Sequence, residues 1–146
     1  MSRRFAQGKY QVINADKYVG NRQPTYRSSW EWSFMKFCDT NPNILKWASE
    51  AVKIPYKDPF TNRQTIYVPD FFIQYADKNS KIHTELIEVK PASQTIKERV
   101  GKNKLNQIQF AKNQYKWRAA YEWCAKQNIK FRILTENDLF HNGKVG

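Results

Sequence analysis

The segment YVPDFFIQYADKNSKIHTELIEVKP, residues 67–91, constrains the fold of this chain more than any other. Two apolar runs separated by the turn sequence DKNS predict two neighbouring antiparallel strands. Charged residues nevertheless interrupt both runs, with Asp70 in the first and Glu88 and Lys90 in the second. A buried carboxylate without a partner is costly, or shifts its pKa until it is neutral. We therefore expect these groups either to satisfy one another or to bind something that the sequence does not contain.

The alternation within each strand indicates which side chains meet. The first strand, TIYVPDFFIQYAD over residues 65–77, is apolar on both sides, as in a central strand. One of its faces carries Ile66, Val68, Asp70 and Phe72. In the second strand Leu86, Glu88 and Lys90 share a face. Because Pro69 cannot donate to a sheet ladder, we expect the first strand to be distorted or unpaired there.

Helical signals lie on both sides of these strands. The run YRSSWEWSF predicts a helix capped by Ser28, with Glu31 at the capping-box spacing. Its apolar stripe is predicted to be Trp30, Phe34, Phe37 and Cys38. A second, long helix is predicted to end near Asn128. Its apolar stripe steps by three or four, through Ile108, Ala111, Tyr115, Ala119 and Trp123.

Two further strands complete the expected fold. Val52, Ile54 and Tyr56 alternate before the turn sequence KDPFTNR, and Phe131, Ile133 and Thr135 alternate near the end of the chain. The order helix, three strands, long helix, strand predicts an α/β fold with a mixed sheet of about four strands between the helices. We expect a basic N-terminal arm over residues 1–26, one domain over residues 27–140 and a tail over residues 141–146.

The charge of the chain indicates its partner. Twenty-five Lys and Arg residues against thirteen Asp and Glu residues give a net charge of +12, which favours a polyanion such as nucleic acid. The run from Lys90 to Arg118 is predicted to be the DNA track, although a solvated helix face is the more usual meaning of such a run. The predicted DNA contacts are Lys97, Arg99, Lys102, Lys104 and Lys112.

Cysteine and histidine spacing excludes a zinc site or a disulfide framework. Cys38 and Cys124 are distant, and His83 and His141 are isolated. The chain contains neither an apolar signal core nor a run of roughly 18 apolar residues that would span a membrane. We therefore expect a protein that is made and used in a reducing cytoplasm, without a membrane partner.

The carboxylates indicate the chemistry. If Glu31, Asp70 and Glu88 converge on one sheet face, each close pair repels by about 1 to 4 kcal/mol. Mg²⁺ removes this repulsion, because it prefers oxygen ligands and retains waters, and Mn²⁺ can substitute for it. A lysine beside such a metal can lower the pKa of an attacking water and neutralise charge on a phosphate. Carboxylates, metal and Lys90 together predict hydrolysis of phosphodiesters in DNA or RNA.

At this point the residues resemble a known family. The strings PDF and EVK, with seventeen residues between Asp70 and Glu88, resemble the signature of the restriction-endonuclease-like PD-(D/E)xK nucleases. The run YRSSWEWSF resembles the S-x-x-E helix in the endonuclease subunit of heteromeric cut-and-paste transposases. The order WASEAVKIPY, YVPDFFI, LIEVKP, FRILTE is similar to that subunit's catalytic domain, and closer still to the small head completion nucleases of T-even-like tailed phages.

The resemblance implies a role for each matching position. Asp70 and Glu88 would bind the metal, with the carbonyl of Val89 completing its sphere and Glu31 binding it directly or through water. Lys90 would be the catalytic lysine. The transposase subunit tends to carry Gln at the position of Glu88, so this chain has the more usual nuclease form. A residue that contacts the scissile phosphate from the long helix stays open among Lys104, Gln107, Lys112 and Gln114.

In its most specific form the resemblance implies a Mg²⁺-dependent DNA endonuclease of phage head completion. It would act on the ends of double-stranded DNA during packaging, with the portal or other head–neck proteins as partners, in the virion and the host cytoplasm. Two alternatives remain. One is a transposon-end or junction-cleaving nuclease, and the other is a structural virion protein that binds DNA without catalysis.

Each site residue also has a plainer interpretation. Glu31 could serve only as a helix cap, and Asp70 as a turn acid at the start of a strand. Glu88 and Lys90 could be an exposed edge pair that contributes little to stability. Glu50 is a competing acid, but SEAVKI is more typical of the beginning of a strand.

Overall fold

The structure, a computed structural model, describes residues 7–139. The first six residues of the predicted arm, His141 and the predicted tail over residues 141–146 lie outside this range. The elements are β1 (Gly8–Lys9), β2 (Thr25–Tyr26), α1 (Ser29–Thr40), β3 (Ile44–Ser49), β4 (Ile54–Asp58), β5 (Arg63–Tyr67), β6 (Phe71–Ala76), β7 (Ile82–Val89), η2 (Ala92–Gln94), α2 (Lys97–Val100), α3 (Lys104–Lys126), β8 (Lys130–Leu134) and α4 (Glu136–Leu139). Among these residues no helix is both long enough and apolar enough to cross a membrane.

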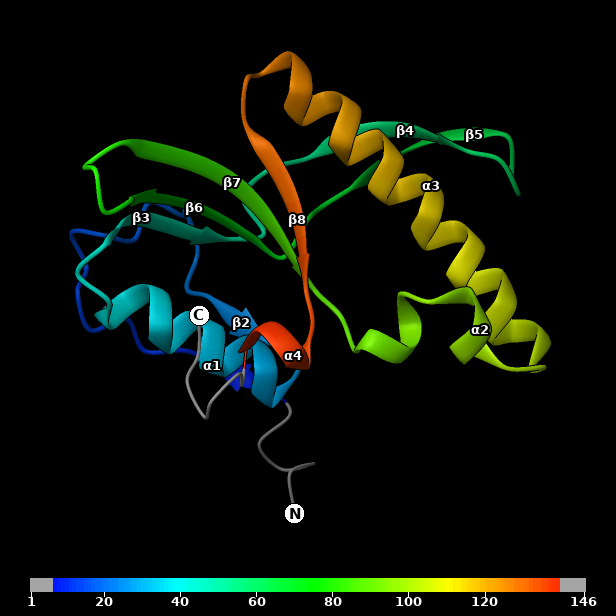
Figure 1. Cartoon of the computed structure of the whole chain (residues 1–146), viewed down its shortest axis with the longest axis horizontal. Coiled ribbons are helices and arrows are strands. Elements are labelled where there is room, and N and C mark those ends of the chain that lie inside the picture. Colours follow the sequence, from blue (N-terminus) through cyan, green and yellow to red (C-terminus); the bar gives the residue numbers. More distant parts are fainter. Residues whose placement is uncertain (1–6, 140–146) are drawn as a thin grey trace.

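A four-stranded mixed sheet organises the fold, as the sequence predicts (Figure 1). Its strand order is β3-β6-β7-β8, and β6 pairs antiparallel with both β3 and β7. β8 runs parallel to β7, which requires a long connection, and α3 lies in that connection. The architecture is that of a restriction-endonuclease-like α/β fold.

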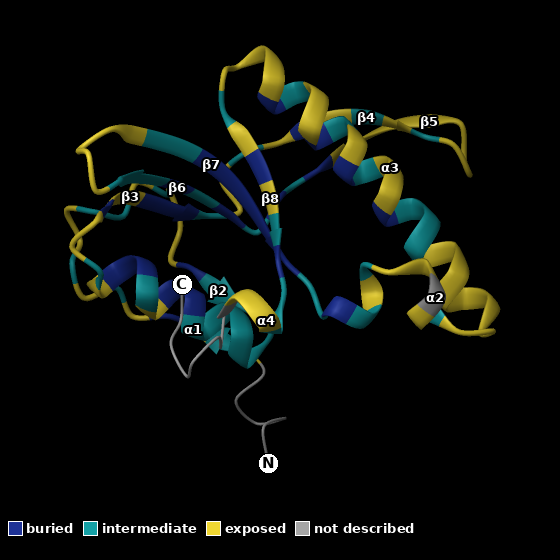
Figure 2. Ribbon diagram, viewed as in Figure 1, coloured by how far each residue is buried: buried dark blue, intermediate teal, exposed yellow. Residues whose placement is uncertain are grey.

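The two faces of the sheet have separate cores, each covered by one long helix. On one face Phe34 and Cys38 of α1 pack with Phe71 of β6 and Ile87 of β7. On the other face Trp117, Ala120 and Cys124 of α3 pack with Leu86 and Phe131. Figure 2 shows the buried residues concentrated in the sheet and on the inner sides of α1 and α3. Successive residues of β7 therefore point to different cores, and Glu85–Val89 are all buried.

The predicted strand over residues 65–77 is wrong as a single strand. The structure divides it into β5 and β6, with a break at residues 68–70 around Pro69. β5 pairs with β4 in a separate antiparallel ribbon, so the predicted strand around Ile54 does not join the main sheet. The sheet's fourth strand is instead β3, which was not predicted. β3 shifts its register between Ile44 and Lys46, and this irregularity removes the period-two pattern that would have revealed it.

The two predicted helices exist, but one apolar stripe is misplaced. α1 begins after Ser28, whose hydroxyl accepts from the Glu31 N–H at 3.1 Å, as a cap should. For α3 the predicted stripe is wrong, because Tyr115 is exposed and the buried residues are Asn113, Trp117, Ala120 and Cys124. Apolar residues occur all round this helix, so periodicity alone could not identify the packed face.

Part of the N-terminal segment is integral to the core around α1. Tyr10 is buried, and its hydroxyl donates to the buried Asp39 carboxylate at 2.7 Å. Tyr18 packs edge-on against Trp47 of β3, with ring centroids 4.7 Å apart. Residues 7–26 are therefore packed against the domain.

Candidate active site

Asp70 and Glu88 come together where three strands meet. Asp70 occupies the break between β5 and β6, and Glu88 is the penultimate residue of β7. The Val89 N–H donates to the Asp70 carboxylate at 2.8 Å, which ties the start of β6 to the end of β7. Pro69 permits this arrangement, because it interrupts the ladder and frees Asp70 from regular strand geometry.

Glu88 is buried, with only 6% of its surface exposed. The Tyr67 hydroxyl donates to one Glu88 oxygen at 2.6 Å, and the Lys90 ammonium lies 3.6 Å from the other. Glu88 pairs in register with Ile133 of β8, so it points to the sheet face that α3 covers. The interpretation of Glu88 and Lys90 as an exposed edge pair is therefore wrong, because the carboxylate lies in the interior.

Glu31 approaches the same place from the first turn of α1. One of its oxygens accepts from the Arg27 N–H at 3.0 Å, so it does help to cap the helix. The Arg27 guanidinium also forms an ion pair with Glu50, which directly follows β3. The Glu50 N–H in turn donates to the Asp70 carbonyl at 2.9 Å. Glu31, Arg27 and Glu50 thus border the Asp70–Glu88 pair.

The carboxylates destabilise one another's charged forms. Burial raises the pKa of Asp70 well above its usual range, and the Glu88 and Glu31 charges raise it further. Burial also raises the pKa of Glu88, although Tyr67 and Lys90 oppose this effect. The pKa of Glu31 is raised by burial and by the charges of Glu50 and Glu88, against the effect of the Arg27 N–H. Such mutual perturbation is typical of functional sites.

The donor set suits a hard divalent cation. Carboxylate oxygens are the ligands that Mg²⁺ prefers, and a cation would relieve the repulsion that raises these pKa values. Within residues 7–139 no group of three or more Asp, Glu, His or Cys side chains is arranged to hold a metal ion by itself. A pair of carboxylates with waters and a backbone carbonyl is nevertheless a sufficient set for Mg²⁺.

The predicted DNA contacts lie on α2, on α3 and between these helices. Lys97, Arg99, Lys102 and Lys104 are exposed, whereas Lys112 is half-buried. The Lys112 ammonium lies 5.8 Å from the centre of the Phe60 ring on the β4–β5 ribbon. Among the four helix candidates for a phosphate contact, Gln107 donates instead to the Gly101 carbonyl at 2.9 Å.

Comparison of the sequence with known proteins shows which family the chain belongs to. Residues 41–136, about two thirds of the chain, match the family model described as TnsA-like endonuclease N terminal. The chain belongs to the TnsA-like endonuclease family. The match contains Asp70, Glu88 and Lys90, and it begins after α1, so Glu31 lies outside it.

A relative of the same size supports the family assignment. The chain is 35% identical over 142 residues to the head completion nuclease of Enterobacteria phage T4, and the alignment covers 90% of this chain and 92% of the relative. Both comparisons support the nuclease role that the carboxylates and Lys90 predict.

Three residues beside the candidate active site were not predicted from the sequence. Tyr67 is bound to Glu88, and Arg27 and Glu50 form the neighbouring ion pair. Glu50 has a left-handed backbone (φ 51°) and directly follows β3 instead of beginning the next strand. Tyr67 could have been identified from the sequence, because it lies close to Pro69 and Asp70. Arg27 and Glu50 could not, because their positions beside the site depend on where β3 lies.

Proposed function

We propose that this TnsA-like nuclease is a metal-dependent endonuclease that hydrolyses phosphodiester bonds of double-stranded DNA. The observation that carries the proposal is the convergence of Asp70, Glu88 and Lys90 at the break between β5 and β6, where the Val89 N–H holds the Asp70 carboxylate and the Lys90 ammonium lies 3.6 Å from Glu88. Such like charges have no structural benefit unless a cation joins them. The net charge of +12 supports a polyanionic substrate.

Each residue has a distinct role in this proposal. Asp70 and Glu88, with the Val89 carbonyl, would hold Mg²⁺ or Mn²⁺, and Glu31 would contribute directly or through a water. Bound there, the cation would supply charge neutralisation on the phosphate and a more acidic water. Lys90 would hold the attacking water and stabilise the negative charge that develops on the phosphate oxygens.

The exposed basic residues would position the DNA. Lys97, Arg99, Lys102, Lys104 and Lys112 would contact phosphates. Lys116 is a further candidate for the scissile phosphate, because its charge is close enough to Glu88 to oppose the rise in the pKa of that carboxyl.

The name of the T4 relative suggests the biological setting. We propose that the protein completes phage heads by acting on DNA ends during packaging, in the virion and the host cytoplasm, beside the portal or other head–neck proteins. The 35% sequence identity to that relative, over most of both chains, favours this role over a transposon-end or junction-cleaving nuclease.

Cleavage of linear and supercoiled DNA tests the proposal. Wild-type protein should cut with Mg²⁺ and not with EDTA, and Asp70→Ala and Lys90→Ala proteins should bind DNA without cutting it. Circular dichroism and a DNA-binding assay would show that each variant is folded and still binds. If wild-type protein binds DNA but cuts no substrate with any divalent metal, the structural virion protein becomes the better account.

A further inference from the structure

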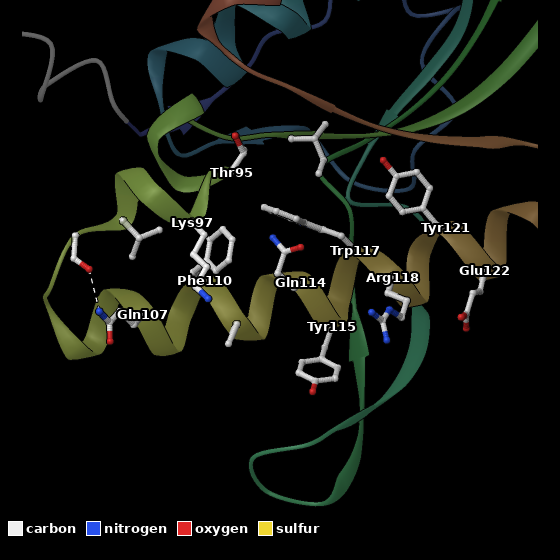
Figure 3. A pocket seen from close by; sticks show the side chains of 14 residues that line it. Thr95, Lys97, Gln107, Phe110, Gln114, Tyr115, Trp117, Arg118, Tyr121 and Glu122 are labelled. Atoms are coloured by element: carbon white, nitrogen blue, oxygen red, sulfur yellow. Dashed lines mark hydrogen bonds between the residues drawn. The ribbon is translucent and has the colours of Figure 1, made fainter.

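A cavity of about 880 Å³ lies over α3, on the side that faces α2 and β8. Phe110, Gln114, Trp117 and Tyr121 extend into it from one face of the helix (Figure 3). We call this cavity the α3 groove. Its volume falls within the range of about 300 to 1,000 Å³ that small-molecule sites occupy.

One end of the α3 groove adjoins the candidate active site. Ile133, which lines the groove, is the direct register partner of Glu88. Trp117 and Tyr67 pack in the same buried cluster, so the groove lies close to the tyrosine that donates to Glu88. A molecule in the groove would therefore sit one residue away from the carboxylate that we propose as a metal ligand.

The groove offers aromatic rings that are partly exposed to solvent. Tyr121 is 54% exposed, and its ring makes a T-shaped contact with Phe131, with ring centroids 5.2 Å apart. Phe110 is half-buried farther along the same face of α3. Aromatic faces of this kind bind unpaired nucleobases by stacking, with little dependence on base identity.

The rim of the groove is cationic. Lys97 and Arg118 line it, and the exposed Arg99, Lys102 and Lys104 continue the basic surface toward the start of α3. Among the described residues that line the groove, Glu122 is the acidic one. Aromatic rings inside a cationic rim complement a single strand, whose bases are free to stack and whose phosphates need neutralisation.

We propose that the α3 groove binds an unpaired DNA strand, such as the overhang of a DNA end, next to the bond that is cut. This inference rests on the proposed nuclease function and refines its substrate. A blunt duplex cannot use the groove, because its bases are already stacked on one another. The protein should therefore bind DNA ends with overhangs more tightly than blunt ends.

Fluorescence anisotropy in EDTA tests the groove without cleavage. Wild-type protein should bind a labelled duplex with a single-stranded overhang about tenfold more tightly than the matching blunt duplex. Tyr121→Ala should remove most of this preference and leave blunt-duplex affinity unchanged. Phe110→Ala gives a second, independent probe of the groove. Ile82→Ala is the matched control, because Ile82 at the start of β7 is 52% exposed, close to the 54% of Tyr121, and does not line the groove.

The outcomes separate the groove from the active site. Equal affinity of wild-type protein for both duplexes, or a preference that survives Tyr121→Ala and Phe110→Ala, would overturn the groove proposal. Cleavage of the blunt duplex with Mg²⁺ reports on the nuclease proposal alone. A protein that cuts blunt DNA but has no overhang preference would retain the active site and lose the groove proposal.

Discussion

Asp39, which is fully buried, and Asp70, which is half-buried, are two aspartates of one small domain whose surroundings shift their pKa values in opposite directions. Asp39 is completely buried near the end of α1. Asp70 lies in the break between β5 and β6, within the candidate active site. Burial raises the pKa of both carboxyl groups, so the difference comes from what surrounds them.

Hydrogen-bond donors surround Asp39. The Tyr10 hydroxyl and the Ile13 N–H each donate to one carboxylate oxygen at 2.7 Å, and the Asn14 N–H donates to the other at 2.9 Å. These donors outweigh burial and hold the pKa of Asp39 below its usual range. The charged form of this carboxylate therefore stabilises the fold, and it fastens the N-terminal segment to α1.

Like charges surround Asp70. The Val89 N–H and the Lys90 charge favour its ionised form, but Glu88 and Glu31 disfavour it, and the pKa rises. The charged form therefore destabilises the fold in the absence of a cation. The comparison shows that donors distinguish a structural carboxylate from a functional one, whereas burial does not.

The largest effect on stability is expected from Asp39→Asn. The amide nitrogen would face backbone N–H groups and leave at least one donor unpaired, which should lower the free energy of unfolding by about 3 kcal/mol. Urea unfolding measures this loss. Asp16→Asn is the control, since Asp16 is exposed and should change stability by less than about 0.5 kcal/mol. A similarly small effect of Asp39→Asn would contradict the structural role.

Two tyrosines sharpen the comparison, because Tyr10 donates to Asp39 and Tyr67 donates to Glu88. Tyr67→Phe removes the group that orients Glu88 and should slow DNA cleavage by about 10- to 100-fold. Tyr10→Phe should cost about 1 kcal/mol of stability and leave the cleavage rate of the folded protein unchanged. Plasmid cleavage and urea unfolding of both variants measure the two effects. Wild-type cleavage by Tyr67→Phe would show that this hydroxyl does not position Glu88.

Asp70→Asn should raise the free energy of unfolding, whereas Asp39→Asn should lower it. The side-chain carbonyl can still accept from the Val89 N–H, and the repulsion from Glu88 and Glu31 disappears. In EDTA at neutral pH the free energy of unfolding should rise by about 1 kcal/mol. Chemical denaturation beside wild type measures the change. A clear loss of stability would mean that the Asp70 charge is structural after all.

The gain from Asp70→Asn should depend on pH. A raised pKa in the folded state means that its stabilising contribution is complete below the ordinary carboxyl value of about 4 and is lost as pH rises through the raised value. The two proteins should therefore be almost equally stable at about pH 4 and diverge toward neutral pH. Unfolding in EDTA across this range measures the divergence, and a difference that is constant with pH would contradict it.

The sequence predicts which residues of the candidate site lie together better than it predicts their surroundings. Asp70, Glu88 and Lys90 are found together because strand alternation and the ladder break at Pro69 are local properties. Arg27 and Glu50 were not predicted as part of the site, because their contact depends on how β3 pairs with β6. β3 itself was missed, since its register shift disrupts the alternation that identifies a strand.

The same distinction between local and distant information explains the fold. The cap of α1 and the hairpin of β6 and β7 follow from nearby residues and were predicted. The packed face of α3 was not, because its small residues Ala120 and Cys124 approach the sheet in place of the larger Tyr115. The α3 groove could not be predicted either, because it combines α2, α3 and β8.

The central claim is that a cation relieves the repulsion at Asp70 and Glu88 and thereby enables cleavage. Unfolding of wild-type and Asp70→Asn proteins with Mg²⁺ and with EDTA tests it most directly. Mg²⁺ should stabilise the wild-type protein and have little effect on Asp70→Asn, which should also fail to cut DNA. Equal stabilisation of both proteins by Mg²⁺, or cleavage by wild type in EDTA, would contradict the account.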